Sequence, residues 1–179
     1  MVPATVPVHR LTYEDVVRMY ETGILDEYDR VELVDGVLVE MSPISIGHDG
    51  ALAWLTNYLA RVGEGTWEVR VQSTFLTPGG FLLPDLMLVE PMRERQPETA
   101  FLVVEVAQTS QARDREKALD YARAKVPDYW IADLQARTLT VCREPTSSGY
   151  ASEQAFVDGD TVTPLAPAAP TVDVTGLMG

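Results

Sequence analysis

Two apolar runs, each interrupted by a single carboxylate, constrain the fold of this chain more than any other feature. Residues 81–89 contain Asp85, and residues 100–107 contain Glu105 between two valines. Short apolar runs bounded by turn residues are typical of buried β-strands. A charged carboxylate within such a strand is costly unless it is paired or binds a metal. The two runs therefore predict neighbouring strands that place Asp85 and Glu105 together as a site for a divalent cation.

The remaining pattern predicts a mixed α/β domain with one central mixed β-sheet flanked by helices on both sides. Thr12 and Asp15 have the spacing of a capping box at the start of a helix. Asp35 and Gly36 are typical of a type I′ turn in a β-hairpin. We expect helices over residues 12–22, 46–62 and 112–124, a hairpin over 31–41, and further strands over 67–76, 129–132, 138–141 and 150–157.

Length and composition place limits on the class of protein. A chain of 179 residues suits a single domain over residues 1–179, with a core of about residues 9–160 and a C-terminal extension over 161–179. The single cysteine, Cys142, excludes an internal disulfide and a zinc site built from several thiolates. Neither a signal peptide nor an apolar run long enough to span a bilayer is evident. We therefore expect a cytoplasmic protein with no membrane partner.

Charge argues against non-specific binding of nucleic acid. The net charge is −13, from 14 basic and 27 acidic residues, and such binding depends on neutralising phosphates. The basic residues are nevertheless concentrated in and around the helix expected over 112–124, and they do not share one face of it. A solvated helix surface is thus the alternative to a substrate-binding surface. These basic residues are Arg93, Arg95, Arg113, Arg115, Lys117, Arg123 and Lys125.

The chemistry of the two carboxylates favours a hard cation. Mg²⁺ binds oxygen ligands, usually one or two carboxylates together with waters and substrate phosphates. Asp85, Glu105 and the backbone carbonyl of Val106 could provide the protein ligands for Mg²⁺, or for Mn²⁺ in its place. A divalent ion polarises a phosphodiester and lowers the pKa of an attacking water. Lys117 is the nearest amine in sequence that could stabilise charge at the scissile phosphate.

These residues resemble the PD-(D/E)-x-K motif of restriction-endonuclease-like nucleases. Over residues 9–150 the chain looks more closely like the Uma-type putative restriction endonucleases, a bacterial family first catalogued as a domain of unknown function. The matching fragments are Arg30-Val31-Glu32-Leu33-Val34-Asp35-Gly36, His48, Pro84-Asp85, Val103-Val104-Glu105-Val106, Asp114 with Lys117 and Tyr121, and Val126-Pro127-Asp128-Tyr129-Trp130-Ile131-Ala132-Asp133.

The resemblance implies a restriction-endonuclease-like core and a metal-dependent endonuclease acting on DNA. It carries Asp85, Glu105 and Lys117 over as catalytic residues, with Glu32 as an additional acidic residue at the same site. His48 and Gln72 are included more loosely.

The chain departs from the general motif at two places. Ala107 stands where the motif lysine would fall, and the resemblance implies that Lys117, from the following helix, replaces it. Gln108-Thr109-Ser110 stands where the family usually has Ser-Pro-Ser. The first departure bears on catalysis more than on fold.

Each candidate residue also has a plain structural interpretation. Asp85 could close a turn after a proline, Glu105 could face solvent on an edge strand, and Lys117 could extend along the helix surface. Glu32 could form a cross-strand pair within its hairpin. His48 and Gln72 are ordinary core or helix-start residues under the same interpretation.

Three functions follow from these alternatives. The first is a Mg²⁺-dependent endonuclease that hydrolyses phosphodiester bonds in DNA. The second is a non-catalytic module that keeps the nuclease fold and binds nucleic acid or a protein. The third is a metal-dependent hydrolase of another phosphate ester. Many restriction enzymes act as dimers, and pairing of exposed C-terminal strands would give a homodimer.

Overall fold

The computed structural model describes residues 7–41, 46–63, 65–107 and 111–179, and the side chains of all of these except 111–114. Its helices are α1 (Tyr13–Glu21), α2 (Ile46–Val62), α3 (Gln111–Arg123) and α4 (Val174–Met178). Its strands are β1 (Val31–Val34), β2 (Val37–Glu40), β3 (Glu68–Val71), β4 (Phe75–Thr77), β5 (Gly80–Leu82), β6 (Leu86–Val89), β7 (Leu102–Ala107), β8 (Asp128–Asp133), β9 (Thr138–Thr146), β10 (Gly149–Val157), β11 (Thr161–Val162) and β12 (Val172–Asp173).

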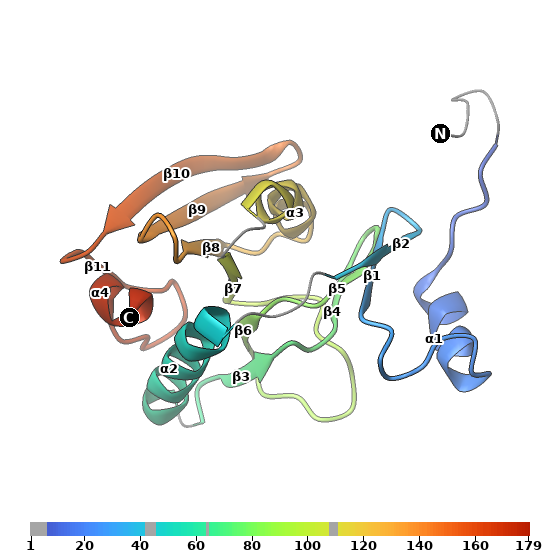
Figure 1. The fold of residues 1–179 in the computed structure, drawn as a ribbon, viewed down its shortest axis with the longest axis horizontal. Coiled ribbons are helices and arrows are strands. Elements are labelled where there is room, and N and C mark those ends of the chain that lie inside the picture. The colour runs from blue at the N-terminus through green and yellow to red at the C-terminus, as the bar shows by residue number, and fades with distance from the viewer. Residues whose placement is uncertain (1–6, 42–45, 64, 108–110) are drawn as a thin grey trace.

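The centre of the molecule is a six-stranded mixed sheet with the order β10-β9-β8-β7-β6-β3. Only β7 and β8 run parallel within it, and α3 connects them. Helices α2 and α3 lie on opposite sides of this sheet (Figure 1). The prediction of a mixed α/β domain with helices on both sides of a central sheet is therefore confirmed.

A second, four-stranded antiparallel sheet with the order β2-β1-β5-β4 was not predicted. It arises because two of the predicted strands each divide into two. The run over 67–76 forms β3 and β4, separated at Gln72, whose φ of 45° turns the backbone out of the extended region. The run over 81–89 forms β5 and β6, separated at Pro84, which has no N–H to donate to a ladder.

The local signals at the N-terminal end behave as predicted. The side chain of Thr12 accepts a hydrogen bond from the N–H of Asp15, whose carboxylate accepts one from the N–H of Thr12, so α1 begins with a capping box. Asp35 and Gly36 have φ values of 46° and 72°. Positive φ at both central residues is the signature of the predicted type I′ turn between β1 and β2.

The central sheet separates two apolar clusters. One lies beneath α2 and includes Leu55, Leu59 and the indole of Trp130. The other lies beneath α3 and includes Tyr121 and Tyr129. Alternate residues of each central strand enter one cluster or the other, as expected for a sheet covered on both faces.

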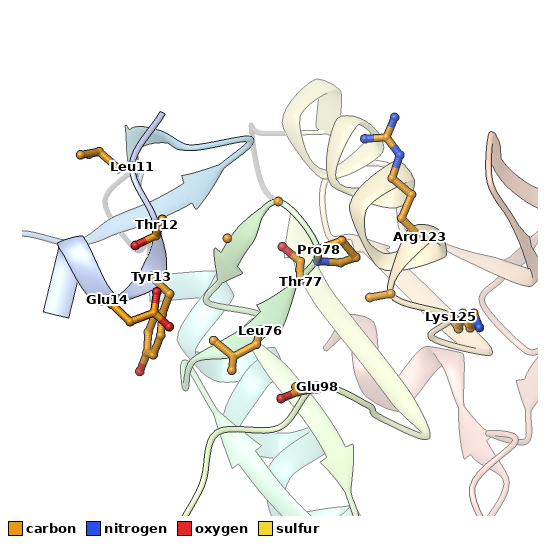
Figure 2. A pocket seen from close by; sticks show the side chains of 13 residues that line it. Leu11, Thr12, Tyr13, Glu14, Leu76, Thr77, Pro78, Glu98, Arg123 and Lys125 are labelled. Atoms are coloured by element: carbon orange, nitrogen blue, oxygen red, sulfur yellow. The ribbon is translucent and has the colours of Figure 1, made fainter. Parts of the chain in front are cut away.

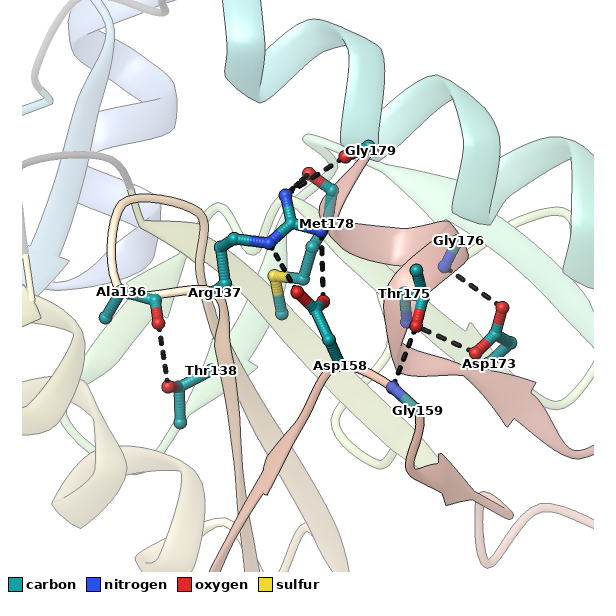
Figure 3. A network of polar contacts seen from close by, with 10 residues as sticks. All are labelled: Ala136, Arg137, Thr138, Asp158, Gly159, Asp173, Thr175, Gly176, Met178 and Gly179. Atoms are coloured by element: carbon teal, nitrogen blue, oxygen red, sulfur yellow. Dashed lines mark hydrogen bonds and ion pairs between the residues drawn. The ribbon is translucent and has the colours of Figure 1, made fainter.

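The segment after β10 packs onto the α2 side of the sheet. Val162, Val172 and Leu177 are buried in the cluster beneath α2. Figure 3 shows how Arg137 holds the chain end: its guanidinium binds Asp158 and donates to the carbonyl of Gly179 at 3.0 Å. Residues 161–179, expected as an extension, thus contribute side chains to the same core as α2.

A separate observation concerns the membrane. Among the residues that the structure describes, no helix combines the length and the apolar character that a membrane crossing would require.

Candidate active site

Asp85 lies in the bend immediately before β6. The antiparallel register pairs Leu86 of β6 with Val104 of β7, so Asp85 lies beside the next residue of β7, Glu105. The N–H of Val106 donates to Asp85 Oδ2 at 2.8 Å. The side chain of Asp85 is therefore fixed against β7. The residue also lies in a bend after Pro84, as expected if it only closed a turn.

Glu105 lies in the middle of a central strand. Val104 and Val106 point into the cluster beneath α2, whereas Val103 and Ala107 point into the cluster beneath α3. By strand alternation, Glu105 shares the α3 face, where it is only 3% exposed. The alternative in which Glu105 faces solvent on an edge strand is therefore wrong.

Lys117 reaches inward from α3 to two carboxylates. Its Nζ lies 2.9 Å from Oε1 of Glu32 and 3.0 Å from Oε1 of Glu105. The residue is only 7% exposed, so the alternative of a lysine extended along the helix surface is wrong. Ala107 is fully buried on the same face of β7. The ammonium group therefore approaches β7 from α3, while the strand position of the general motif is occupied by a methyl group.

Glu32 brings the second sheet into this cluster. It is fully buried on β1, and its Oε1 also accepts a hydrogen bond from the N–H of Leu83 at 3.0 Å. Its partner across the hairpin is the apolar Val39, so the alternative of a polar cross-strand pair within the hairpin is wrong. Lys117 thus connects a carboxylate of the four-stranded sheet to Glu105 of the six-stranded sheet.

Both residues that were included more loosely lie against Asp85. Nε2 of His48, near the start of α2, is 2.9 Å from Asp85 Oδ2. The N–H of Gln72 donates to the main-chain carbonyl of Asp85 at 3.1 Å. His48 therefore contacts the carboxylate itself, whereas Gln72 contributes its backbone to the bend that carries it.

The environment keeps Asp85 ionised. Burial works to raise the pKa of its carboxyl group, but hydrogen bonds from His48 and from the N–H of Val106, with the nearby charge of Lys117, lower that pKa below its usual value. The hydrogen bond to Asp85 raises the pKa of His48 against the opposing effect of burial. A negative charge on Asp85 is what a cation ligand requires.

Lys117 is held in its charged form by the same cluster. Burial alone would lower its pKa, but the charges of Glu105 and Glu32 and the hydrogen bonds to them raise it well above its usual value. A lysine with this environment does not act as a general base near neutral pH. Its chemistry is that of a fixed positive charge beside Glu105.

The donor set fits a hard divalent cation. The cluster contains three carboxylates, from Asp85, Glu105 and Glu32, and two basic side chains, from Lys117 and His48. Both hydrogen bonds that Asp85 accepts through its side chain from described residues end on Oδ2, and Oδ1 receives none from them. Within the described part of the chain, no group of three or more His, Cys, Asp or Glu residues is placed to hold one ion together. Mg²⁺ needs only one or two carboxylates when waters and phosphates complete its shell.

Tyr121 belongs to the cluster although it was noted only as part of the family resemblance. Its hydroxyl donates to Oε1 of Glu105 at 2.8 Å. The spacing of four residues from Lys117 places both on one side of α3, and this was the signal available in the sequence. Gln108-Thr109-Ser110, the second departure from the family pattern, lies outside the described residues.

A groove lies away from these residues. A groove of about 590 Å³ runs between the start of α1, the turn that joins β4 to β5, and the end of α3 (Figure 2). Thr12, Pro78, Arg123 and Lys125 are among its lining residues, and none of the predicted site residues borders it. Its walls carry charges of both signs, so it shows no preference for an anionic ligand.

Comparison with known proteins identifies the family. A model of the Uma2 family, described as putative restriction endonucleases, matches residues 13–174. This chain belongs to the Uma2 family. Among curated proteins, none matches it.

One solved structure supports the assignment of the fold. The chain is similar to a putative nuclease belonging to DUF820 from Anabaena variabilis ATCC 29413, with a TM-score of 0.77 and 13% identity over 94% of this chain and 97% of the other. It also resembles part of the type IIG restriction endonuclease BpuSI, with a TM-score of 0.43 and 19% identity over 71% of this chain and 16% of that one. The first similarity establishes a nuclease fold, as the resemblance predicted. Membership of the Uma2 family supports a nuclease.

Proposed function

We propose that this Uma2 protein is a Mg²⁺-dependent endonuclease that hydrolyses phosphodiester bonds in DNA. The observation that supports this most directly is the position of Asp85, in the bend before β6, beside Glu105 on the neighbouring strand β7, with Lys117 Nζ 3.0 Å from Glu105. Family membership supports the same reaction class. Mn²⁺ would substitute for Mg²⁺ because both prefer oxygen ligands.

Each residue has a distinct role in this proposal. Asp85 and Glu105, with the carbonyl of Val106, hold the ion. When bound, the ion polarises the phosphate and lowers the pKa of the attacking water. Lys117 provides a fixed positive charge that orients the water or offsets charge on the scissile phosphate. Glu32 holds Lys117 in place through its 2.9 Å contact.

The direct test uses supercoiled plasmid DNA incubated with the protein in Mg²⁺, in Mn²⁺, or in EDTA. We expect nicked or linear product with either ion and none with EDTA. Asp85→Asn should abolish cleavage, whereas Asp158→Asn, in an exposed ion pair with Arg137, should cleave like the wild type. Cleavage by Asp85→Asn at the wild-type rate would exclude the proposed site.

A non-catalytic nuclease-fold module is the second candidate. Two observations favour it: Ala107 replaces the motif lysine, and the net charge is −13. It predicts DNA or protein binding that neither EDTA nor Asp85→Asn alters. Activity on a small phosphodiester without activity on DNA would instead indicate a hydrolase of another phosphate ester.

A homodimer is proposed as the acting form. β10 is a nine-residue edge strand whose hydrogen-bonded neighbour among the described strands is β9 alone. Two copies of such an edge can pair about a two-fold axis. Light scattering at working concentration should give twice the monomer mass, and a monomer mass would contradict this assembly. Residence in the cytoplasm stays a prediction from the sequence.

A further inference from the structure

Tyr121 is a fully buried tyrosine whose hydroxyl meets a candidate metal ligand. Its ring packs against those of Phe75 and Tyr129, with centroid separations of 5.9 Å and 4.8 Å. Its hydroxyl donates to Glu105 Oε1 at 2.8 Å. Complete burial and contact with two rings restrict movement of the side chain, so its hydroxyl is a well-ordered donor.

The hydroxyl and Lys117 act on the same atom. Lys117 Nζ donates to Glu105 Oε1 at 3.0 Å, and Tyr121 donates to that oxygen at 2.8 Å. Because both donors come from α3, they hold one oxygen of Glu105 toward that helix and restrict rotation of the carboxylate. The ammonium group of Lys117 contacts both Glu32 and Glu105, whereas the Tyr121 hydroxyl donates to Glu105.

The phenol of Tyr121 donates to Glu105 Oε1 as an uncharged group. A neutral donor orients the carboxylate without neutralising its charge. Partners of this kind, which hold a ligating carboxylate in place, contribute substantially to metal affinity.

We propose that Tyr121 is a positioning residue that holds Glu105 in the orientation required to bind the divalent ion. This inference rests on the proposed function, because it requires Glu105 to be a metal ligand. It adds that the aromatic cluster beneath α3 sets the metal affinity of the site as well as its stability. Tyr121 itself touches neither the ion nor the substrate.

The cluster provides a matched control. Tyr150 belongs to the same aromatic group, stacks on Tyr129 with a centroid separation of 5.9 Å, and donates its hydroxyl to the main-chain carbonyl of Val126 at 2.9 Å. Tyr150→Phe therefore removes a hydroxyl from the same cluster without touching a carboxylate. Tyr121→Phe removes one that touches Glu105, and both variants keep their rings.

The experiment is calorimetric titration of the wild type, Tyr121→Phe, Tyr150→Phe and Glu105→Gln with Mn²⁺, with a thermal melt of each protein. We expect Tyr121→Phe to bind Mn²⁺ about tenfold more weakly than the wild type. Tyr150→Phe should bind like the wild type, and Glu105→Gln should not bind. The melts of the two Phe variants should show similar small losses of Tm, which separates positioning from stability.

The outcomes distinguish the two proposals. If Tyr121→Phe binds Mn²⁺ like the wild type while Glu105→Gln does not bind, the positioning role is wrong and the proposed metal site stands. If Tyr150→Phe weakens binding as much as Tyr121→Phe does, the effect comes from the cluster in general, and the specific role is also wrong. If Glu105→Gln binds as tightly as the wild type, or the wild type does not bind, both proposals fail.

Discussion

Two buried aspartates at opposite ends of β7 have very different surroundings. Asp128, at the start of β8, accepts on Oδ1 from Trp130 at 2.8 Å and from Arg143 at 2.8 Å. Its Oδ2 accepts from Arg143 at 3.1 Å and from the N–H of Leu165 at 2.9 Å. Asp85, at the other end, receives hydrogen bonds from described residues on Oδ2 only.

The difference separates a structural carboxylate from a candidate ligand. Both oxygens of Asp128 are satisfied by protein donors, so it has no capacity for an ion, and its charge is balanced by Arg143. Asp85 keeps one oxygen without a donor from the described residues. Burial alone would have ranked Asp128 first, since it is the less exposed of the two. Whether both carboxylate oxygens already have protein donors is thus a better guide to a metal ligand than burial is.

The largest expected effect comes from the lysine of the Asp85 end. Lys117→Met leaves Glu32 and Glu105 buried without their shared cation, and loss of one partner from a buried ion pair costs roughly 3–5 kcal/mol. Urea denaturation measures the loss. Mn²⁺ should raise the Tm of this variant more than that of the wild type, because the ion replaces the missing positive charge.

The control for this prediction is Lys125→Met, which removes an exposed lysine just after α3. It should change the free energy of unfolding by less than about 0.5 kcal/mol. A loss below about 1 kcal/mol in Lys117→Met would mean that the cluster is well hydrated and the comparison with Asp128 is unfounded.

The next largest effect should come from the saturated end. Asp128→Ala leaves the indole of Trp130, the guanidinium of Arg143 and the N–H of Leu165 without their acceptor. We expect a loss of about 3 kcal/mol, at the lower end for a broken buried pair because Arg143 is partly exposed. The affinity of the Asp128→Ala variant for Mn²⁺ should equal that of the wild type. Weaker metal binding in this variant would show that the two ends of β7 are not independent.

Cys142 provides a smaller, pH-dependent measure of order at the Asp128 end, since it pairs with Tyr129 on β8. Burial, and then the charge of Glu153, raise the pKa of its thiol from 9.0 to about 11. The thiolate is the reactive form. A pKa of about 11 in place of 9.0 predicts alkylation about 100-fold slower in the folded protein than in the unfolded chain at pH 8. The rate should rise with pH until about pH 11.

Iodoacetamide labelling followed by mass spectrometry measures this rate. Asp128→Ala should accelerate it and Asp85→Asn should not. Equal acceleration in both variants would mean that the Asp85 end is as important for the order of β9 as the Asp128 end.

The smallest effect should come from an exposed ion pair that joins α3 to β10. Arg115 binds Glu153 at 3.1 Å, but both side chains are more than half exposed. Such pairs contribute about 0–1 kcal/mol, so Arg115→Ala should change the free energy of unfolding by about 0.5 kcal/mol or less. A loss above 2 kcal/mol in urea denaturation, on the order of a buried pair, would show that exposure does not separate the two classes here.

Local signals in the sequence were sufficient for the elements that they specify directly. The capping pair Thr12 and Asp15 and the turn at Asp35-Gly36 depend on residues close in the chain, and both were predicted correctly. The proximity of Asp85 and Glu105 also followed from local patterns, because two neighbouring apolar runs each carried one carboxylate. Their roles as ligands stay a prediction.

Long-range features could not be read in the same way. Alternation within residues 67–76 shows that they are extended, but it does not show that β3 and β4 join different sheets. The burial of Lys117 depends on Glu32, which lies 85 positions earlier in the chain. The saturation of Asp128 depends on Arg143 and on a backbone N–H at Leu165. None of these partners has a signal in the local sequence.

The link from Glu32 through Lys117 to Glu105 also has a consequence for synthesis of the chain. The three residues come from β1, α3 and β7, so the cluster can form only after α3 has emerged from the ribosome. Contacts between segments so distant in sequence form slowly, because a long loop must close first. A nascent chain that ends between β7 and α3 would therefore carry the acidic residues of the site without the lysine that holds them.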